Sequence, residues 1–162
     1  MTDYIIRELY KEEIPLLDDF LYNAIFIPHG YKEPVPRDII YTDSKVYAFI
    51  KDFGTRHDDC CLVAEVANKV VGAVWARISD GYGKIDNKTP SLAISLYKEF
   101  RSQGIGTALM KSILSLLKSK GYNRVSLGVN KENYAVRMYE KCGFEIIGDG
   151  DDESEWLMVC KL

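Results

Sequence analysis

The sequence has few of the residues on which metal centres and disulfide frameworks depend. It contains two histidines and four cysteines in 162 residues, and the cysteines stand at positions 60, 61, 142 and 160. No pair of cysteines forms a C-x-x-C motif or stands at a metal-ligand distance from a histidine, so we expect no metal site. The cysteines are expected to be reduced and to pack as small apolar residues. As neighbours on a strand, Cys60 and Cys61 should point to opposite faces of a sheet.

Long apolar runs and clusters of basic residues are also missing. No stretch approaches the roughly 18 apolar residues of a membrane-spanning helix. The first residues, MTDYIIRELYKEE, lack the apolar centre of a signal peptide, which predicts a cytoplasmic protein. The formal net charge is −3 without a cluster of Lys and Arg, which argues against a nucleic acid or an anionic membrane as the main partner.

What is present is the composition of an ordinary globular protein, with 47% hydrophobic and 28% charged residues and no internal repeat. The length favours one domain over residues 1–162. Hydrophobic periodicity and turn residues predict strands at 3–9, 60–66, 70–78, 91–97, 124–130, 144–148 and 155–162. They predict helices at 11–26, 44–54, 105–120 and 133–142, and a proline-rich loop at 27–38. This order indicates a mixed α/β fold in which the strands at 91–97 and 124–130 run parallel across a helical crossover.

The segment FRSQGIGTALM (100–110) places two glycines between a predicted strand and a predicted helix. Such a bend directs unpaired backbone N–H groups at an anion, and the helix dipole favours negative charge there. A Walker P-loop is ruled out, because no lysine follows Gly106 until Lys111. A Rossmann dinucleotide motif is disfavoured, because Leu109 occupies the third glycine position and no acid follows at the required distance. The spacing that remains is Arg-x-x-Gly-x-Gly, formed by Arg101, Gly104 and Gly106.

Two segments together resemble the GNAT superfamily of N-acetyltransferases. RSQGIG (101–106) is similar to the family's [RQ]-x-x-G-x-[GA] motif, and NYAVRMYEKCGF (133–144) is similar to its N-x-A-x-x-x-Y-E-K-x-G-F motif. The resemblance implies a mixed, mostly antiparallel sheet of about six to seven strands with about four flanking helices. It also implies that the parallel strand pair splays apart. The implied co-substrate is acetyl-CoA, with no metal.

The resemblance also implies roles for individual residues. The loop opened by Arg101 would wrap the coenzyme A pyrophosphate with backbone amides, and the preceding strand would hold the pantetheine arm. An N–H near Leu96 would polarise the thioester carbonyl. Asn133 is expected to cap a helix and to contact the coenzyme, and Tyr139 is expected to protonate the departing thiolate. The full set of expected coenzyme contacts is Ile94, Ser95, Leu96, Arg101, Ser102, Gln103, Gly104, Ile105, Gly106, Thr107 and Asn133.

The general base is unassigned, because the strand SLAISLY offers serines where many family members carry a glutamate. Candidates from elsewhere are Tyr22, His29, Tyr31, Glu33, Asp38 and Glu65. An acyl-cysteine on Cys142 is disfavoured, because direct transfer in a ternary complex needs no covalent carrier.

The acceptor is expected to be a small-molecule or peptide amine, in a pocket that the loop 27–38 helps to shape. The apolar last strand, WLMVC, could pair across a homodimer. Two other functions stay open: a non-catalytic acyl-CoA-binding sensor or regulatory module, and, with less support, a dinucleotide-binding oxidoreductase.

Overall fold

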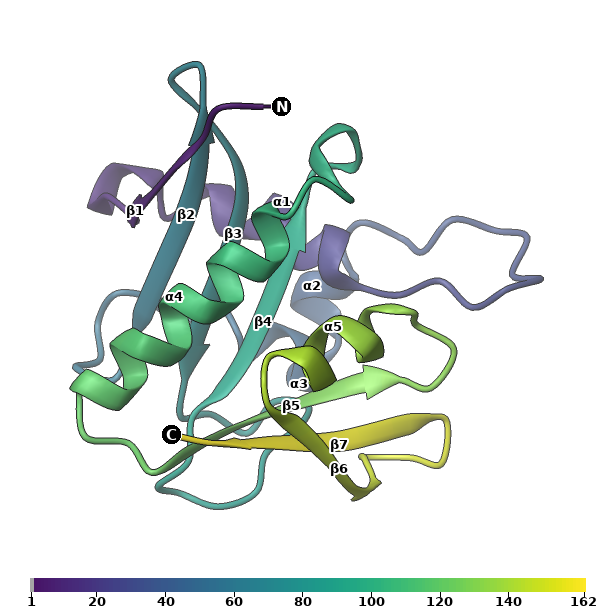
Figure 1. Cartoon of the computed structure of the whole chain (residues 1–162). Coiled ribbons are helices and arrows are strands. Elements are labelled where there is room, and N and C mark those ends of the chain that lie inside the picture. Colours follow the sequence, from purple (N-terminus) through teal and green to yellow (C-terminus); the bar gives the residue numbers. More distant parts are fainter. Residues whose placement is uncertain (1) are drawn as a thin grey trace.

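The computed structural model describes residues 2–162, so Met1, where the expected domain begins, lies outside the described residues. Seven strands form one mixed sheet in the order β1-β2-β3-β4-β5-β7-β6 (Figure 1). The strands are β1 (Ile5–Glu8), β2 (Cys60–Val66), β3 (Lys69–Arg77), β4 (Ser91–Leu96), β5 (Arg124–Asn130), β6 (Phe144–Asp149) and β7 (Glu155–Lys161). The helices are α1 (Leu16–Ala24), α2 (Ile39–Thr42), α3 (Ser44–Tyr47), α4 (Ile105–Ser119) and α5 (Ala135–Lys141), with short 3-10 turns at Lys11–Glu13 and Lys98–Phe100.

Helices cover both faces of the sheet (Figure 1). On one face α4 and α5 pack over a core that includes Ile113, fully buried on α4. On the other face α1, α2 and α3 pack over a second core that includes Trp75. The expectation for the adjacent cysteines is confirmed, because Cys60 belongs to the first core and Cys61 to the second. All four cysteines are free thiols.

The expected strands all form, whereas the first helices are shorter than the sequence pattern predicts. Pro15 stands at the N-cap of α1, so the expected helix 11–26 is divided into a 3-10 turn and α1. Asp43 caps α3 by accepting hydrogen bonds from two backbone N–H groups, but regular helix ends at Tyr47 and turns continue to Gly54. Helix α2 was not predicted, because its four residues, IIYT, are too few to show a periodic pattern.

Strands β4 and β5 are parallel but barely joined. Ser91 and Ser126 are the one residue pair in register between them, and the Ser126 N–H donates to Pro90 O at 3.0 Å. The two serine hydroxyls lie 3.2 Å apart, and the Ser126 hydroxyl also donates to Gly83 O at 2.6 Å. Beyond this point the strands diverge, which confirms the expected splayed pair.

The expectation that the last strand could pair with another chain in a homodimer is wrong. Strand β7 pairs with β5 on one edge and with β6 on the other, so neither of its edges is open to another chain. The edges of the sheet are instead β1 and β6.

A buried arginine ties the sheet to the segment that follows α3. The side chain of Arg77 is fully buried, and its Nε donates to Asp59 Oδ1 at 2.7 Å. Its Nη1 donates to the carbonyl groups of Ala48 at 3.1 Å and Lys51 at 2.7 Å. These bonds satisfy two backbone carbonyl groups of the turns that follow α3.

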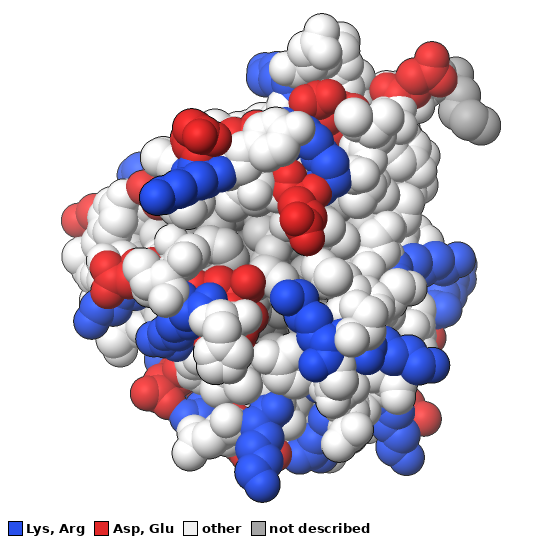
Figure 2. All heavy atoms as spheres, turned by 90° about the vertical axis from the view of Figure 1, so that its left-hand side faces the viewer, with Lys and Arg blue, Asp and Glu red and all other residues white. Residues whose placement is uncertain are grey.

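The surface carries charges of both signs. On the face in Figure 2, acidic and basic side chains are interspersed rather than separated into two regions. Among the described residues, no helix is long and apolar enough to span a membrane, and no three metal-ligating side chains converge.

Candidate active site

The loop before α4 presents a row of free backbone N–H groups. Helix α4 begins at Ile105 and extends for 15 residues, and Gly104 precedes it with φ +85°. Ser102 also has a positive φ, of 61°. Within residues 2–162, the N–H groups from Ser102 to Thr107 have no backbone or side-chain acceptor. Six amides at the start of a long helix therefore remain available to an anion.

The two glycines of this loop differ in how strictly their positions require glycine. A Cβ added at Gly104 would meet nothing within 4 Å, so it is the left-handed backbone that favours glycine there. Gly106 has ordinary helical backbone, and its Cβ would lie 3.4 Å from Leu96 Cδ1, an ordinary contact. This difference fits a motif that requires glycine at the first position and accepts alanine at the second.

Arg101 links the loop to the end of β4. Its Nε donates to Leu96 O at 3.1 Å, and Gln103 Nε2 donates to Glu99 O at 3.0 Å. Both bonds join residues of the segment between β4 and α4 and so stabilise this turn.

Backbone groups of β4 are free along the diverging edge. The Tyr97 N–H donates to Val71 O of β3 at 2.9 Å. Because successive N–H groups of a strand point to opposite edges, the N–H groups of Ile94 and Leu96 point toward β5. The β4 and β5 ladder has already ended there, so these groups have no strand partner.

A cavity of about 600 Å³ joins the loop, the free edge of β4 and helix α5. We call it the glycine-loop cavity. The expected coenzyme contacts that line it are Ile94, Ser95, Leu96, Arg101, Ser102, Gly104, Gly106, Thr107 and Asn133, together with the expected acid Tyr139. Gln103 and Ile105 do not line it, so only their backbone N–H groups belong to the row of free amides. The Ser95 hydroxyl points away, donating to Phe20 O at 2.6 Å.

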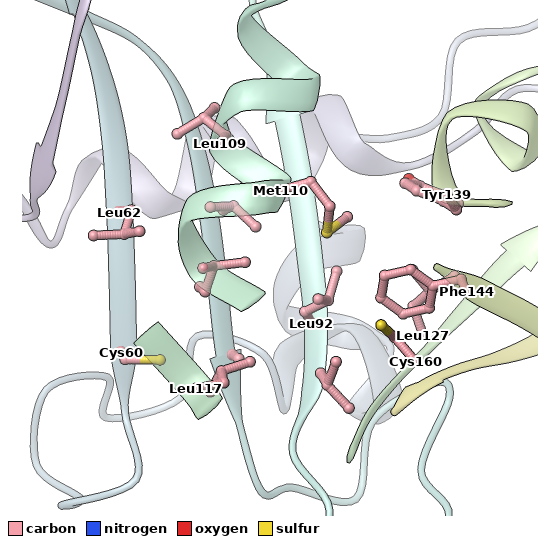
Figure 3. Packing of buried hydrophobic residues seen from close by; sticks show 14 of the residues in the cluster. Cys60, Leu62, Leu92, Leu109, Met110, Leu117, Leu127, Tyr139, Phe144 and Cys160 are labelled. Carbon is pink, nitrogen blue, oxygen red and sulfur yellow. The ribbon is translucent and has the colours of Figure 1, made fainter. Parts of the chain in front are cut away.

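Tyr139 lies where α5 meets the gap between β4 and β5. The residue is 8% exposed, its ring lies 6.1 Å from that of Phe144, and its oxygen is at the end nearer β4 in Figure 3. Burial raises the pKa of Tyr139 to about 12. The phenol therefore stays protonated and available as a donor throughout the physiological range.

Asn133 caps α5, as expected. Its Oδ1 accepts from the Ala135 N–H at 2.9 Å, while Tyr134 takes the formal N-cap position one residue later. The exposed face of Asn133 lines the cavity.

A second cavity, of about 310 Å³, lies deeper in the same gap. We call it the carboxylate cavity, because Asp43, Asp152 and Glu155 line it. It extends to the α1 to α3 side of the sheet, where Leu21 and Phe49 line it, and it reaches Tyr139 on the other side. Both cavities share Ala24, Ile25, Phe26, Ile94, Asn133 and Tyr139. The gap between β4 and β5 thus forms a passage through the sheet.

Residues 21–144 match the model of the acetyltransferase (GNAT) family. The chain belongs to the GNAT family.

Relatives of this GNAT chain are about 30% identical to it over the aligned residues. An uncharacterised N-acetyltransferase of Methanocaldococcus jannaschii is 31% identical over 98% of this chain and 66% of its own length. An N-alpha-acetyltransferase of Sulfurisphaera tokodaii is 30% identical over 72% of this chain and 77% of its own. A probable N-acetyltransferase camello of Xenopus tropicalis is 31% identical over 59% of this chain, and this GNAT chain covers 42% of that protein. This GNAT chain thus spans less than two thirds of the length of the Methanocaldococcus and Xenopus relatives.

Solved structures share the fold. The PaiA N-acetyltransferase of Thermoplasma acidophilum, determined in complex with coenzyme A, superposes with a TM-score of 0.69 at 22% identity and covers 99% of each chain. A GNAT acetyltransferase of Streptococcus pneumoniae gives a TM-score of 0.69 at 21% identity, over 99% of this chain and 100% of the other. The seven-stranded mixed sheet of this GNAT chain, with its splayed β4 and β5, is therefore the family's fold.

Most of the suggested bases lie away from both cavities. His29, Tyr31, Glu33, Asp38 and Glu65 line neither of them. Glu65 is instead held in an ion pair with Arg7 at 3.0 Å. Tyr22 lines the glycine-loop cavity, but its hydroxyl donates to Val35 O. Cys142 also lines neither cavity, and burial raises its pKa, which keeps it a thiol.

Sequence reasoning missed the carboxylates that do line the passage. Asp152 and Glu155 belong to the segment DGDDESE, which has the composition of a solvated turn. The glycine inside the strand RVSLGVN, Gly128, gave no signal for them, because the backbone of Gly83 approaches it most closely.

Proposed function

We propose that this GNAT domain transfers an acetyl group from acetyl-CoA directly to an amine held in a ternary complex. The observation that carries the proposal is the row of free amides from Ser102 to Thr107, which opens into the same cavity as Tyr139 and the free edge of β4.

The residues present fit coenzyme A. Six backbone N–H groups at the N-terminus of a 15-residue helix can donate hydrogen bonds to a pyrophosphate, and the helix dipole favours its negative charge. The N–H groups of Ile94 and Leu96, directed into the gap, match the amide groups of an extended pantetheine arm. When bound, acetyl-CoA supplies the activated acetyl group as a thioester.

The residues of this chain would act on the two ends of that thioester. The Leu96 N–H would donate to the carbonyl oxygen, and a fixed donor of this kind is worth more in a dry gap than in water. The Tyr139 hydroxyl would donate to the sulfur as the C–S bond breaks. Burial raises the pKa of the Tyr139 phenol and would raise the pKa of the coenzyme A thiol as well, so the two pKa values would remain similar.

The test combines binding with turnover. Calorimetry with acetyl-CoA measures affinity, and release of free thiol with spermidine, benzylamine and a short peptide with a free N-terminus measures turnover. Tyr139→Phe should bind acetyl-CoA with unchanged affinity and lower the turnover about 10²- to 10⁴-fold, the usual contribution of a general acid. Unchanged turnover in this variant would refute the role of Tyr139. Tight acetyl-CoA binding without turnover on any amine would favour a sensor or regulatory module instead.

A further inference from the structure

The carboxylate cavity offers a base for the acceptor amine, and the question is which carboxylate is free to act. An alkylammonium with a pKa near 10 has no lone pair and must lose a proton before it attacks. Asp43, Asp152 and Glu155 all line the cavity, so each reaches the passage in which an acceptor would meet the thioester.

Asp43 is occupied by structural hydrogen bonds. Its Oδ1 accepts from the N–H groups of Lys45 at 3.0 Å and Val46 at 3.3 Å, which caps α3. Its Oδ2 accepts from the Tyr82 hydroxyl at 3.1 Å. Both oxygens of Asp43 are thus held by structural partners.

Asp152 is occupied as well. Its Oδ1 accepts from the Ser154 N–H at 2.7 Å and from the Ser154 hydroxyl. These two bonds hold the pKa of Asp152 below its ordinary value, so its carboxylate is a weak base.

Glu155 differs from both. Within residues 2–162 its carboxylate takes part in no hydrogen bond and no ion pair, and the residue is half-buried. It pairs with Asn130 across β5 and β7, so its side chain shares a face of the sheet with Asn130 and Gly128. A Cβ added at Gly128 would lie 3.7 Å from Glu155 Oε2. This is an ordinary van der Waals distance, so the carboxylate lies beside the backbone of Gly128.

We propose that Glu155 is the general base of the transfer, acting from the side of the sheet opposite the glycine loop. This assignment rests on the proposed acetyltransferase function. Glu155 takes one proton from the acceptor ammonium, and the freed lone pair forms the C–N bond as the C–S bond breaks. The thiolate gains a proton from Tyr139. The second proton that the nitrogen loses returns through water to the phenol, and the proton on Glu155 leaves to solvent, so one proton is released per acetyl group.

The electrostatic setting supports a base at this position. Burial, and then the charges of Asp152 and Asp151, raise the pKa of Glu155, while Lys45 lowers it. Tyr82, Asp43 and Tyr139 are the other titratable groups that line the cavity. A raised pKa makes Glu155 a stronger base, because it reduces the difference between its pKa and that of the acceptor ammonium. The excess negative charge of the cavity attracts a cationic acceptor.

Glu155→Gln tests the assignment, with Glu153→Gln as the matched control. Glu153 is an exposed carboxylate of the same turn, lines neither cavity, and its replacement removes the same charge. Acetyl-CoA affinity by calorimetry should be unchanged in both variants. At neutral pH, Glu155→Gln should lower kcat/KM for the best amine of the panel about 10²- to 10⁴-fold, while Glu153→Gln keeps wild-type turnover.

The pH profile separates a base from a merely structural residue. The defect of Glu155→Gln should shrink roughly tenfold per pH unit as pH rises toward the pKa of the amine, because the free amine then forms without a base. Glu155→Asp should lie between the variant and the wild type. A Glu155→Gln enzyme with wild-type turnover, or with a defect independent of pH, would overturn the assignment and leave the proposed function standing. A wild-type protein that releases no thiol with any amine would overturn both.

Discussion

Replacing Gly104 by alanine should weaken acetyl-CoA binding as well as destabilise the fold. Gly104 has φ +85°, and an L-residue in this left-handed region costs about 1–2 kcal/mol. For a domain of this size, each kcal/mol corresponds to a fall of about 2–4 °C in Tm. The new Cβ meets no protein atom within 4 Å, so strain in the backbone is the whole cost to the fold.

The loss of binding has a separate origin. The amides from Ser102 to Thr107 can converge on one anion only if Gly104 keeps its backbone conformation. A hydrogen bond to a charged group is worth about 1.5–3 kcal/mol, so losing one of these bonds weakens acetyl-CoA affinity roughly tenfold to a hundredfold.

Two other glycines provide matched controls. Gly121 follows α4 with φ +92° and also has nothing within 4 Å of an added Cβ, so Gly121→Ala should cost the same stability and leave affinity unchanged. Gly106→Ala, on ordinary helical backbone, should not lower Tm, because alanine favours the helix by about 1 kcal/mol.

The assay is calorimetric titration of acetyl-CoA beside thermal unfolding for all three variants. Equal acetyl-CoA affinity in Gly104→Ala and Gly121→Ala would refute the argument that the amide row binds the coenzyme.

Three further outcomes follow from the structure. Because Arg101 Nε bonds Leu96 O, Arg101→Met should lower acetyl-CoA affinity about tenfold by calorimetry, whereas Arg101→Gln, which the family motif accepts, should lower it less. With its pKa near 12, Tyr139 is protonated below that pH and ionised above it, so only about 1% of the phenol is ionised at pH 10. Ionisation of this tyrosine should therefore cause no loss of turnover up to pH 10, and an alkaline loss that disappears in Tyr139→Phe would contradict this. Arg77→Met leaves the buried Asp59 carboxylate unpaired and should lower the free energy of unfolding by about 3–5 kcal/mol in urea titrations, whereas the exposed pair of Arg124 and Asp86 should contribute less than about 1 kcal/mol.

The order of elements could be predicted because most strands and the long helix have a clear period in the sequence. Ile105, Leu109 and Ile113 recur on one face of α4, and all three are fully buried. The short helices were harder, because α2 and α3 have four residues each and owe their conformation to the caps and tertiary contacts around them.

The coenzyme side of the candidate site could be predicted because it is built from one continuous segment with fixed glycine spacing. The acceptor side could not, because its residues meet only through the fold. Glu155 reaches the passage through its register against Asn130 and through its position beside Gly128. Neither relation is local in the sequence, and an acidic turn gives no sign of which carboxylate is left without a partner.

The divergence of β4 and β5 has a consequence for the abundance of the protein. Ser91 and Ser126 are the one pair in register between β4 and β5, and no ladder joins these strands beyond it. A ligand that fills the gap between the two strands adds its binding free energy to the folded state alone. At a concentration a hundred times its Kd, such a ligand adds about 2.7 kcal/mol to the free energy of unfolding. A change of this size shifts the fraction of unfolded molecules exposed to proteolysis. The lifetime of the protein would then rise and fall with the concentration of acetyl-CoA, because acetyl-CoA would bind in the gap between β4 and β5 of the folded state.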